Sequence, residues 1–256
     1  MRTIGILGGM GPAATLDFYG RLVDLRGAGR DTDHPPCLLN SATQIPDRTN
    51  HIVGVGPDPA PALVEGALVL EAGGAEFIAI PCNTAHAYLR AMREAVSIPI
   101  LDMIATAVAA VQREVPDARQ VGILATTGTL TIGLYDGLLR EAGCEPLHPE
   151  ESDQIRVMEA IHSIKGGNPG PDERLSRAAL ALVDRGAVAI IMGCTEIPLG
   201  LDTQSCPAKV IDATQTLAEM TLSLALGELE FDDVPGAVSP ERPAASAIRD
   251  PSSNPG

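Results

Sequence analysis

The sequence predicts an α/β fold with two similar domains, each a mostly parallel sheet flanked by helices. Three observations support this prediction. Short runs rich in Ile, Val and Leu alternate with longer stretches of helical periodicity, as in βαβ units. The same pattern starts again in the second half of the chain. A length of 256 residues with a hydrophobic share of 45% is enough to bury the cores of two such domains.

The first half begins with a buried strand at Thr3 to Leu7, which ends in a glycine-rich turn at residues 8–11. Pro12 then opens a helix, because its missing N–H group is harmless in the first helical turn. Two more strands are expected at residues 37–41 and 77–80, and two more helices at residues 60–72 and 83–95.

The second half repeats this order. A strand at Val121 to Leu124 ends in a turn of small residues, as the first strand does. Further along, a strand followed by a cysteine recurs, so that Cys194 lies 112 residues after Cys82. A strand that recurs together with the residue at its end indicates duplication. We therefore expect two domains related by a pseudo-two-fold axis, with the active site between them.

The domain boundaries follow from this repeat. We expect residues 1–103 to form the first domain and residues 104–207 the second. A strand at Val210 and Ile211 and a helix at residues 214–229 are predicted to return to the first domain, as residues 208–231, because the second half already has a complete set of elements. Residues 232–256 contain five prolines and little apolar content, so we expect a disordered tail.

Composition excludes several classes of partner. The formal net charge of −15 repels nucleic acid and anionic membranes, and a chain with no Trp, three Phe and three Tyr has no aromatic platform for bases. No apolar run approaches the roughly 18 residues of a membrane helix, and the start of the chain lacks a secretory pattern. We expect a cytoplasmic protein that binds neither nucleic acid nor membrane.

The cysteines predict reduced thiols and no metal site. The chain has five of them, an odd number at wide spacing, and it is long enough to fold without disulfides. Neither a CxxC nor an HExxH pair occurs. Cys37, Cys144 and Cys206 fit the ordinary behaviour of cysteine as a small buried hydrophobe.

Cys82 and Cys194 are different, because each follows a predicted strand, where ligands bind in open α/β sheets. Each also precedes a predicted helix with capping residues, and a helix N-terminus lowers the pKa of a thiol, whereas desolvation opposes this. Two thiols on opposite sides of a substrate could remove a proton from one face of a carbon and return one to the other face. His86, one turn after Cys82, is interpreted as a histidine with structural hydrogen bonds.

Cofactor chemistry finds little support in the sequence. Lys165 and Lys209 are the only lysines, and neither lies in a motif suited to a Schiff base with pyridoxal phosphate. The turn at residues 8–11 does not meet the GxGxxG spacing of dinucleotide-binding folds. We therefore expect no cofactor.

Three motifs together resemble the aspartate/glutamate racemases, and the aspartate racemase branch in particular. They are ILGGMGP at residues 6–12, PCNTAH at residues 81–86 and GCTEIP at residues 193–198, and the resemblance spans residues 1–230. It implies a cofactor-independent amino-acid racemase in which Cys82 and Cys194 exchange the roles of proton donor and acceptor, in a cleft between two domains. It also implies a homodimer.

The resemblance also indicates a substrate. Glutamate racemases carry Asp-Ser-Gly after the first strand and His after the second Cys-Thr, whereas this chain has Gly-Met-Gly around Met10 and has Glu196. These differences favour aspartate. QIPDRT, which runs from Gln44 to Thr49, also matches the aspartate branch, and the family pattern implies that Arg48 and Lys165 hold the side-chain carboxylate.

Physical arguments concern the same residues. Arginine offers a planar fork to a carboxylate, although Arg48 could instead pair with Asp47 on the surface, and Lys165 could be either a ligand or a surface residue. Hydroxyl, amide and helix N–H groups can form a binding site for the α-carboxylate. The residues expected there are Asn83, Thr84 and Thr195, with Thr126 or Thr129 contributing from the second half.

Two alternatives remain open at this stage. One is a cysteine-dependent enzyme of the same superfamily that acts on another small dicarboxylate, as an isomerase of maleate or as a decarboxylase. The presence of both cysteines argues against the decarboxylase, which delivers only one proton. The other is a non-catalytic module that binds an amino acid without turnover.

Overall fold

The computed structural model describes residues 1–237 and contains two parallel sheets. The first has the order β2-β1-β3 and the second the order β5-β4-β6-β7. Their strands are β1 (Ile4–Gly8), β2 (Cys37–Ser41), β3 (Phe77–Ala79), β4 (Gln120–Ala125), β5 (Glu145–Leu147), β6 (Ala189–Gly193) and β7 (Lys209–Asp212). In each sheet the strand that comes first in the chain lies between the next two, which is the similarity that the repeat in the sequence predicts.

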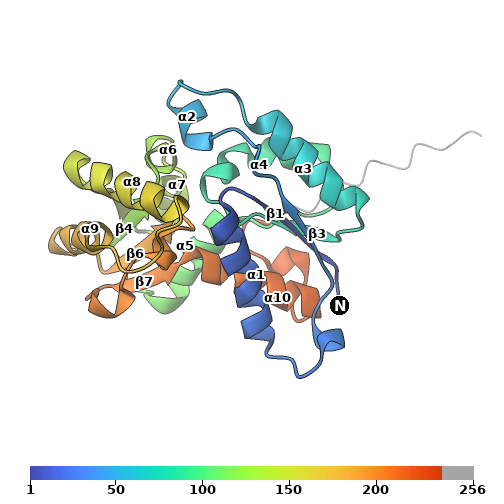
Figure 1. Cartoon of the computed structure of the whole chain (residues 1–256). Helices are drawn as coiled ribbons and strands as arrows, with labels where there is room; N and C mark the ends of the chain where they lie inside the picture. Colours follow the sequence, from blue (N-terminus) through green and yellow to red (C-terminus); the bar gives the residue numbers. More distant parts are fainter. Residues whose placement is uncertain (238–256) are drawn as a thin grey trace, which may run out of the picture.

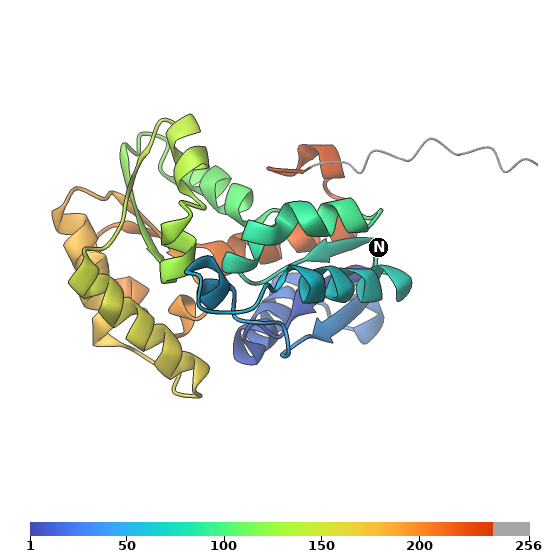
Figure 2. The same cartoon turned by 90° about the horizontal axis from the view of Figure 1, so that it is seen from above.

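Helices surround both sheets, and the two sheets lie side by side in the molecule (Figures 1 and 2). The α-helices are α1 (Pro12–Arg26), α2 (Arg48–Ile52), α3 (Ala60–Ala72), α4 (Leu89–Ala95), α5 (Met103–Glu114), α6 (Thr127–Thr131), α7 (Asp136–Glu141), α8 (Glu151–Lys165), α9 (Glu173–Asp184) and α10 (Ala213–Leu226). Short 3-10 helices are η1 (Asp31–Asp33), η2 (Thr84–Tyr88), η3 (Ile197–Leu199), η4 (Thr203–Ser205) and η5 (Phe231–Asp233). The predicted α/β fold class is confirmed.

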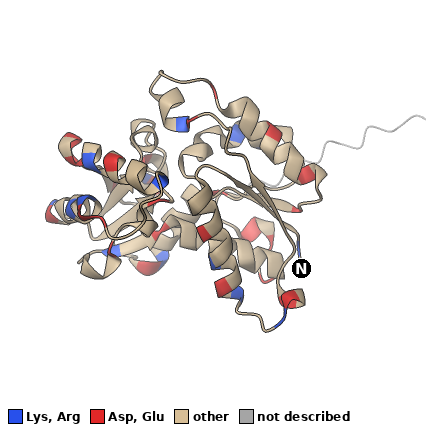
Figure 3. Ribbon diagram, in the orientation of Figure 1, with Lys and Arg blue, Asp and Glu red and all other residues tan. Residues whose placement is uncertain are grey.

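Each sheet is buried on both faces because its strands alternate between two cores. In β1, Ile4 and Ile6 belong to a core shared with α1, α5 and α10, whereas Leu7 belongs to a second core under α3 and α4. In β4, Val121 and Ile123 join the shared core, and Leu124 packs under α8 and α9. The shared core therefore ties the two sheets together through α5 and α10. Charged residues lie mainly on the helices and loops around the sheets (Figure 3).

The predicted return of residues 208–231 to the first domain is wrong for the strand. β7 pairs in parallel with β6, with Ile190 opposite Val210, and so extends the second sheet. The helix that follows, α10, packs against α1 and α5. Near its C-terminal end, the backbone carbonyl of Ala225 accepts a hydrogen bond of 2.8 Å from the N–H of Arg2. β7 can pair with β6 because one edge of β6 is not occupied by β4, and the sequence does not reveal which edge is free.

The predicted disordered tail is wrong for its first residues. Val234 is 4% exposed and joins the shared core. It follows Phe231, the residue before the predicted tail, whose ring packs edge-on against Phe77 with ring centroids 5.7 Å apart. Arg93 donates a hydrogen bond of 2.8 Å to the carbonyl of Gly236. The rest of the predicted tail, residues 238–256, lies outside the described residues. Within residues 1–237, no helix combines the length and the apolar character needed to cross a membrane.

Candidate active site

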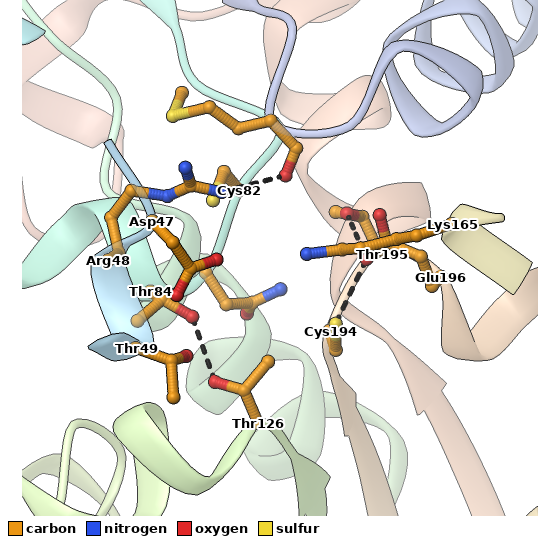
Figure 4. Close-up of a pocket in the computed structure, with 12 residues that line it drawn as sticks. Asp47, Arg48, Thr49, Cys82, Thr84, Thr126, Lys165, Cys194, Thr195 and Glu196 are labelled. Carbon is orange, nitrogen blue, oxygen red and sulfur yellow. Dashed lines mark hydrogen bonds between the residues drawn. The ribbon is translucent and has the colours of Figure 1, made fainter. Parts of the chain in front are cut away.

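A cavity lies where the loops after β3 and β6 meet α2, the start of α6 and the end of α8 (Figure 4). It holds about 280 Å³ of space not filled by atoms, part of it open to solvent. Its lining is polar, with two thiols, two basic and two acidic side chains among its members. The lining residues are Met10, Asp47, Arg48, Thr49, Cys82, Asn83, Thr84, Thr126, Lys165, Cys194, Thr195 and Glu196.

The two thiols come from corresponding places in the two sheets. β3 lies beside β1 and β6 lies beside β4, and each is followed by one of the cysteines. Cys82 and Cys194 are 5% and 6% exposed, neither forms a disulfide, and they lie on opposite sides of the cavity (Figure 4). This arrangement presents one sulfur to each side of a small molecule placed between them.

The predicted helix N-termini beside the thiols are wrong. Cys82 is followed by the 3-10 helix η2, and α4 begins only at Leu89, because Tyr88 leaves helical geometry with a φ of −109° and a ψ of 9°. Cys194 is followed by the three-residue 3-10 helix η3. Such short elements have only a small dipole, so they offer a thiolate little stabilisation.

Cys194 is a thiol with an acidic partner. Its Sγ donates a hydrogen bond of 3.0 Å to Oε2 of Glu196, and Thr195 donates to the same oxygen at 3.3 Å. Burial raises the pKa of Cys194 well above its ordinary value, and the charge of Glu196 raises it further, against the opposing charge of Lys165. Of the two opposing effects on the thiol pKa that the sequence suggested, desolvation prevails at Cys194, and the hydrogen bond to Glu196 favours the thiol form.

His86 has a structural role, as predicted. Its Nδ1 bonds to the carbonyl of Cys82 at 2.9 Å, and its Nε2 accepts from the backbone N–H of Met103 at 3.0 Å. Both ring nitrogens are thereby occupied, with Nδ1 as donor and Nε2 as acceptor. The imidazole has no nitrogen left to activate the neighbouring thiol.

Arg48 is buried in the cavity wall, and no carboxylate within residues 1–237 forms an ion pair with it. Its guanidinium donates to the carbonyls of Pro46 at 3.0 Å and Met10 at 3.2 Å, and its Nε has no hydrogen-bond partner among the described residues. Asp47 instead caps α2, accepting from the N–H of Asn50 at 2.8 Å, so the alternative surface pair does not form. A guanidinium that stays charged and is 7% exposed favours an anionic ligand.

Lys165 is the last residue of α8, and its side chain extends into the cavity (Figure 4). Burial alone would lower the pKa of Lys165, but the acidic Glu196 and the two cysteines raise it overall. The ammonium group is therefore charged, and it gives the cavity a second cation. Lys165 is exposed to solvent and also lines the cavity, so it combines the two positions that the sequence left open.

Asn83 and three threonines supply further polar groups. The hydroxyl of Tyr135 donates a hydrogen bond to Oδ1 of Asn83, whereas the buried Nδ2 of the same amide has no partner among the described residues. Thr84, Thr126 and Thr129 form a triangle of hydroxyl groups with Oγ1 separations of 3.0, 3.0 and 3.1 Å. This triangle joins the first half of the chain to the second beside the cavity.

Ten of the eleven predicted site residues line the cavity, and Gln44 does not. Its side chain is exposed, in the turn between β2 and α2. Asp47 and Thr49 line the cavity but were not predicted. Their position in the chain on either side of Arg48 is the signal that could have identified them. Within residues 1–237, no His, Cys, Asp and Glu side chains are grouped as a metal site would require.

Comparisons with known proteins identify the family of this chain. A family model described as Asp/Glu/hydantoin racemase matches residues 7–221. The chain is similar to the broad specificity amino-acid racemase RacX of Bacillus subtilis, with 32% identity over 229 residues that cover 86% of this chain and 96% of RacX. The fold and the sequence thus place this chain in the class of amino-acid racemases, which are isomerases. It belongs to the Asp/Glu/hydantoin racemase family.

Solved structures show the same architecture. The aspartate racemase of Picrophilus torridus superposes with a TM-score of 0.75 at 27% sequence identity, over 88% of this chain and 94% of that one. A glutamate racemase from Francisella tularensis, in complex with D-glutamate, gives a TM-score of 0.62 at 19% identity, over 94% of this chain and 86% of that one. The second similarity concerns the fold alone.

Proposed function

We propose that this protein racemises an acidic amino acid, aspartate in the first place, without a cofactor, by proton transfer between Cys82 and Cys194. The observation that carries the proposal is the pair of free thiols on opposite sides of one cavity. A racemase must remove a proton from one face of the α-carbon and supply one to the other. One base cannot easily reach both faces, whereas two opposed thiols can.

In one direction, the thiolate of Cys82 takes the proton from the α-carbon and becomes a thiol. The electron pair of the broken C–H bond delocalises into the α-carboxylate. The Sγ–H of Cys194 then gives its proton to the opposite face and leaves a thiolate. Because the pKa of Cys194 is raised, this residue is suited to act first as the donor. In the other direction the two thiols exchange roles.

The charges in the cavity support an acidic substrate. Arg48 and Lys165 are two cations in one small space, and the guanidinium has no carboxylate partner among the described residues. We assign the side-chain carboxylate to these two groups. The α-carboxylate is assigned to Asn83, Thr84 and Thr195, with Thr126 at the edge, because their amide and hydroxyl groups can donate to an anion.

The relatives supply a range of substrates to test. The Picrophilus relative is an aspartate racemase, and RacX is described as a broad specificity racemase. We place aspartate first because two cations suit a dicarboxylate. Met10 and Glu196 line the cavity and are proposed to shape the substrate pocket, whereas Gln44 is exposed. We also propose a homodimer located in the cytoplasm.

The direct test uses the purified protein in deuterated water without added cofactor. Each enantiomer of aspartate and glutamate is incubated separately, and both optical rotation and deuterium at the α-carbon are followed. We expect loss of optical activity together with deuterium incorporation, faster for aspartate. A non-catalytic binding module would give neither. An isomerase of a small dicarboxylate would convert maleate and leave the amino acids unchanged.

A further inference from the structure

Tyr135 lies between α6 and α7, outside the residues that line the cavity, and is 1% exposed. Its hydroxyl is its only side-chain polar group, and a buried hydroxyl without a partner is costly. The partner is Oδ1 of Asn83, the residue directly after Cys82. Tyr135 comes from the second half of the chain and Asn83 from the first, so this bond crosses between the halves.

The ring of Tyr135 contacts the other thiol-bearing loop. A Cβ atom at Gly193, the residue directly before Cys194, would lie 3.0 Å from Cε2 of this ring and 3.1 Å from Cβ of Ala125. A side chain at this position would require the ring to shift by a few tenths of an ångström. One aromatic side chain therefore touches the residue after one candidate thiol and the residue before the other.

The bond from Tyr135 also decides which end of the Asn83 amide is free. Because Oδ1 already accepts from the hydroxyl, Nδ2 is the amide atom left for a ligand, and it is buried without a partner among the described residues. An N–H donor suits a carboxylate, whereas an amide oxygen in the same place would repel one. Among the described residues, no other side-chain hydrogen bond holds the amide in that orientation.

We propose that Tyr135 is a positioning residue, which holds the Asn83 amide as a hydrogen-bond donor to the substrate carboxylate and braces the two thiol-bearing loops. This inference rests on the proposed function and assigns a role to a residue outside the cavity. It separates the two parts of the side chain. The hydroxyl orients the amide, and the ring keeps the spacing of the loops.

The test is Tyr135→Phe, which removes the hydroxyl and keeps the ring, with Tyr19→Phe as the matched control on the partly exposed face of α1. We expect Tyr135→Phe to raise the KM for the amino acid about tenfold, the scale of one lost hydrogen bond to a charged group, while kcat changes less than about threefold. Tyr19→Phe should change neither. A purely structural role would lower the unfolding midpoint of Tyr135→Phe and leave KM unchanged, and that result would overturn the proposal.

Variants of Asn83 keep the proposal testable if Tyr135→Phe does not fold. Asn83→Asp keeps an acceptor for the Tyr135 hydroxyl but removes the Nδ2 donor, so its KM should rise at least as much. In an Asn83→Ala background, adding Tyr135→Phe should raise KM no further. Additive effects would overturn the proposed link. If the wild type racemises and these variants match it, only this inference fails; if the wild type neither binds nor converts any amino acid, the proposed function fails and the inference with it.

Discussion

Arg48 and Cys194 are both buried in the wall of the cavity, but burial affects them differently. A thiol can remain neutral, and Cys194 does so, with its proton shared with Glu196. A guanidinium cannot lose its proton in a protein, so Arg48 carries its charge into a site where its hydrogen bonds within residues 1–237 all go to carbonyl oxygens. Cys194 is therefore suited to donate a proton, and Arg48 is suited to bind an anion.

Replacing Arg48 tests the second statement. Arg48→Lys keeps the charge but loses the planar fork and the bonds to the carbonyls of Pro46 and Met10. Loss of hydrogen bonds to a charged group costs about 1.5–3 kcal/mol, so we expect KM for aspartate to rise about 10- to 100-fold. Steady-state kinetics would measure it, with Arg90→Lys on the exposed face of α4 as control. An unchanged KM would remove Arg48 from the binding site.

Replacing Glu196 tests the first statement. The carboxylate of Glu196 raises the pKa of Cys194, after the larger effect of burial, because it disfavours a second negative charge nearby. In Glu196→Gln this charge is gone, so more thiolate should exist at a given pH. We expect the pH midpoint for alkylation of Cys194, followed by mass spectrometry of its peptide, to move to lower pH.

The control for this measurement is Glu228→Gln, an exposed position at the end of α10. Its alkylation midpoint should match that of the wild type. A midpoint in Glu196→Gln that stays the same or rises would show that the carboxylate does not act on the thiol.

At the scale of elements, α2 and α6 meet across the edge of the cavity. A Cβ atom at Gly128 in α6 would lie 2.9 Å from both Cα and Oγ1 of Thr49, the residue next to Arg48 in α2. This glycine permits a close approach between an element of the first half and one of the second. The position of Arg48 therefore depends on how closely these two short helices pack.

Gly128→Ala is expected to push α2 away from α6. Overpacking of this kind costs about 1–3 kcal/mol of unfolding free energy, and the displaced Arg48 should raise KM severalfold. Urea unfolding and steady-state kinetics measure the two effects. Gly137→Ala in α7 is the matched control, because its Cβ meets no atom within 4 Å, and alanine there should leave KM unchanged and raise helix stability slightly. If both variants behave alike, the α2–α6 contact does not position Arg48.

Most elements could be predicted from the sequence, and the failures have local causes. The helix predicted at residues 60–72 agrees with α3, and the strand predicted at residues 37–41 agrees with β2. Each is a hydrophobic segment with turn residues on both sides. The helix predicted at residues 83–95 divides into η2 and α4, since a 3-10 turn and an α-turn place apolar residues almost alike over five residues. The sequence pattern does not distinguish the two.

At the scale of the whole molecule, the predicted domain assignment failed for the last strand, because its position depends on contacts between segments far apart in the chain. A parallel strand can join any free edge, and the choice of β6 by β7 depends on packing that no local pattern records. The same holds for the hydrogen bond between Tyr135 and Asn83, which are 52 residues apart in the chain. Cys82 and Cys194 were predictable because the ends of parallel strands meet at one edge of a sheet. Arg48 and Lys165 lie in helices, and they were expected from the family resemblance.

The position of the two thiols is itself a property of the whole molecule. Cys82 belongs to a loop after the first sheet and Cys194 to a loop after the second, and the shared core through α5 and α10 fixes the sheets relative to each other. If the proposed mechanism is correct, each thiol serves one face of the α-carbon and therefore one enantiomer.

Deuterium exchange by the single-cysteine variants tests this claim most directly. Cys82→Ala and Cys194→Ala are each incubated with L-aspartate and with D-aspartate in deuterated water, and α-carbon deuterium and optical rotation are measured up to alkaline pH. We predict that neither variant racemises aspartate, that each exchanges the α-proton of only one enantiomer, and that the two variants exchange opposite enantiomers. Exchange of the same enantiomer by both variants, or continued racemisation by either, would contradict the account.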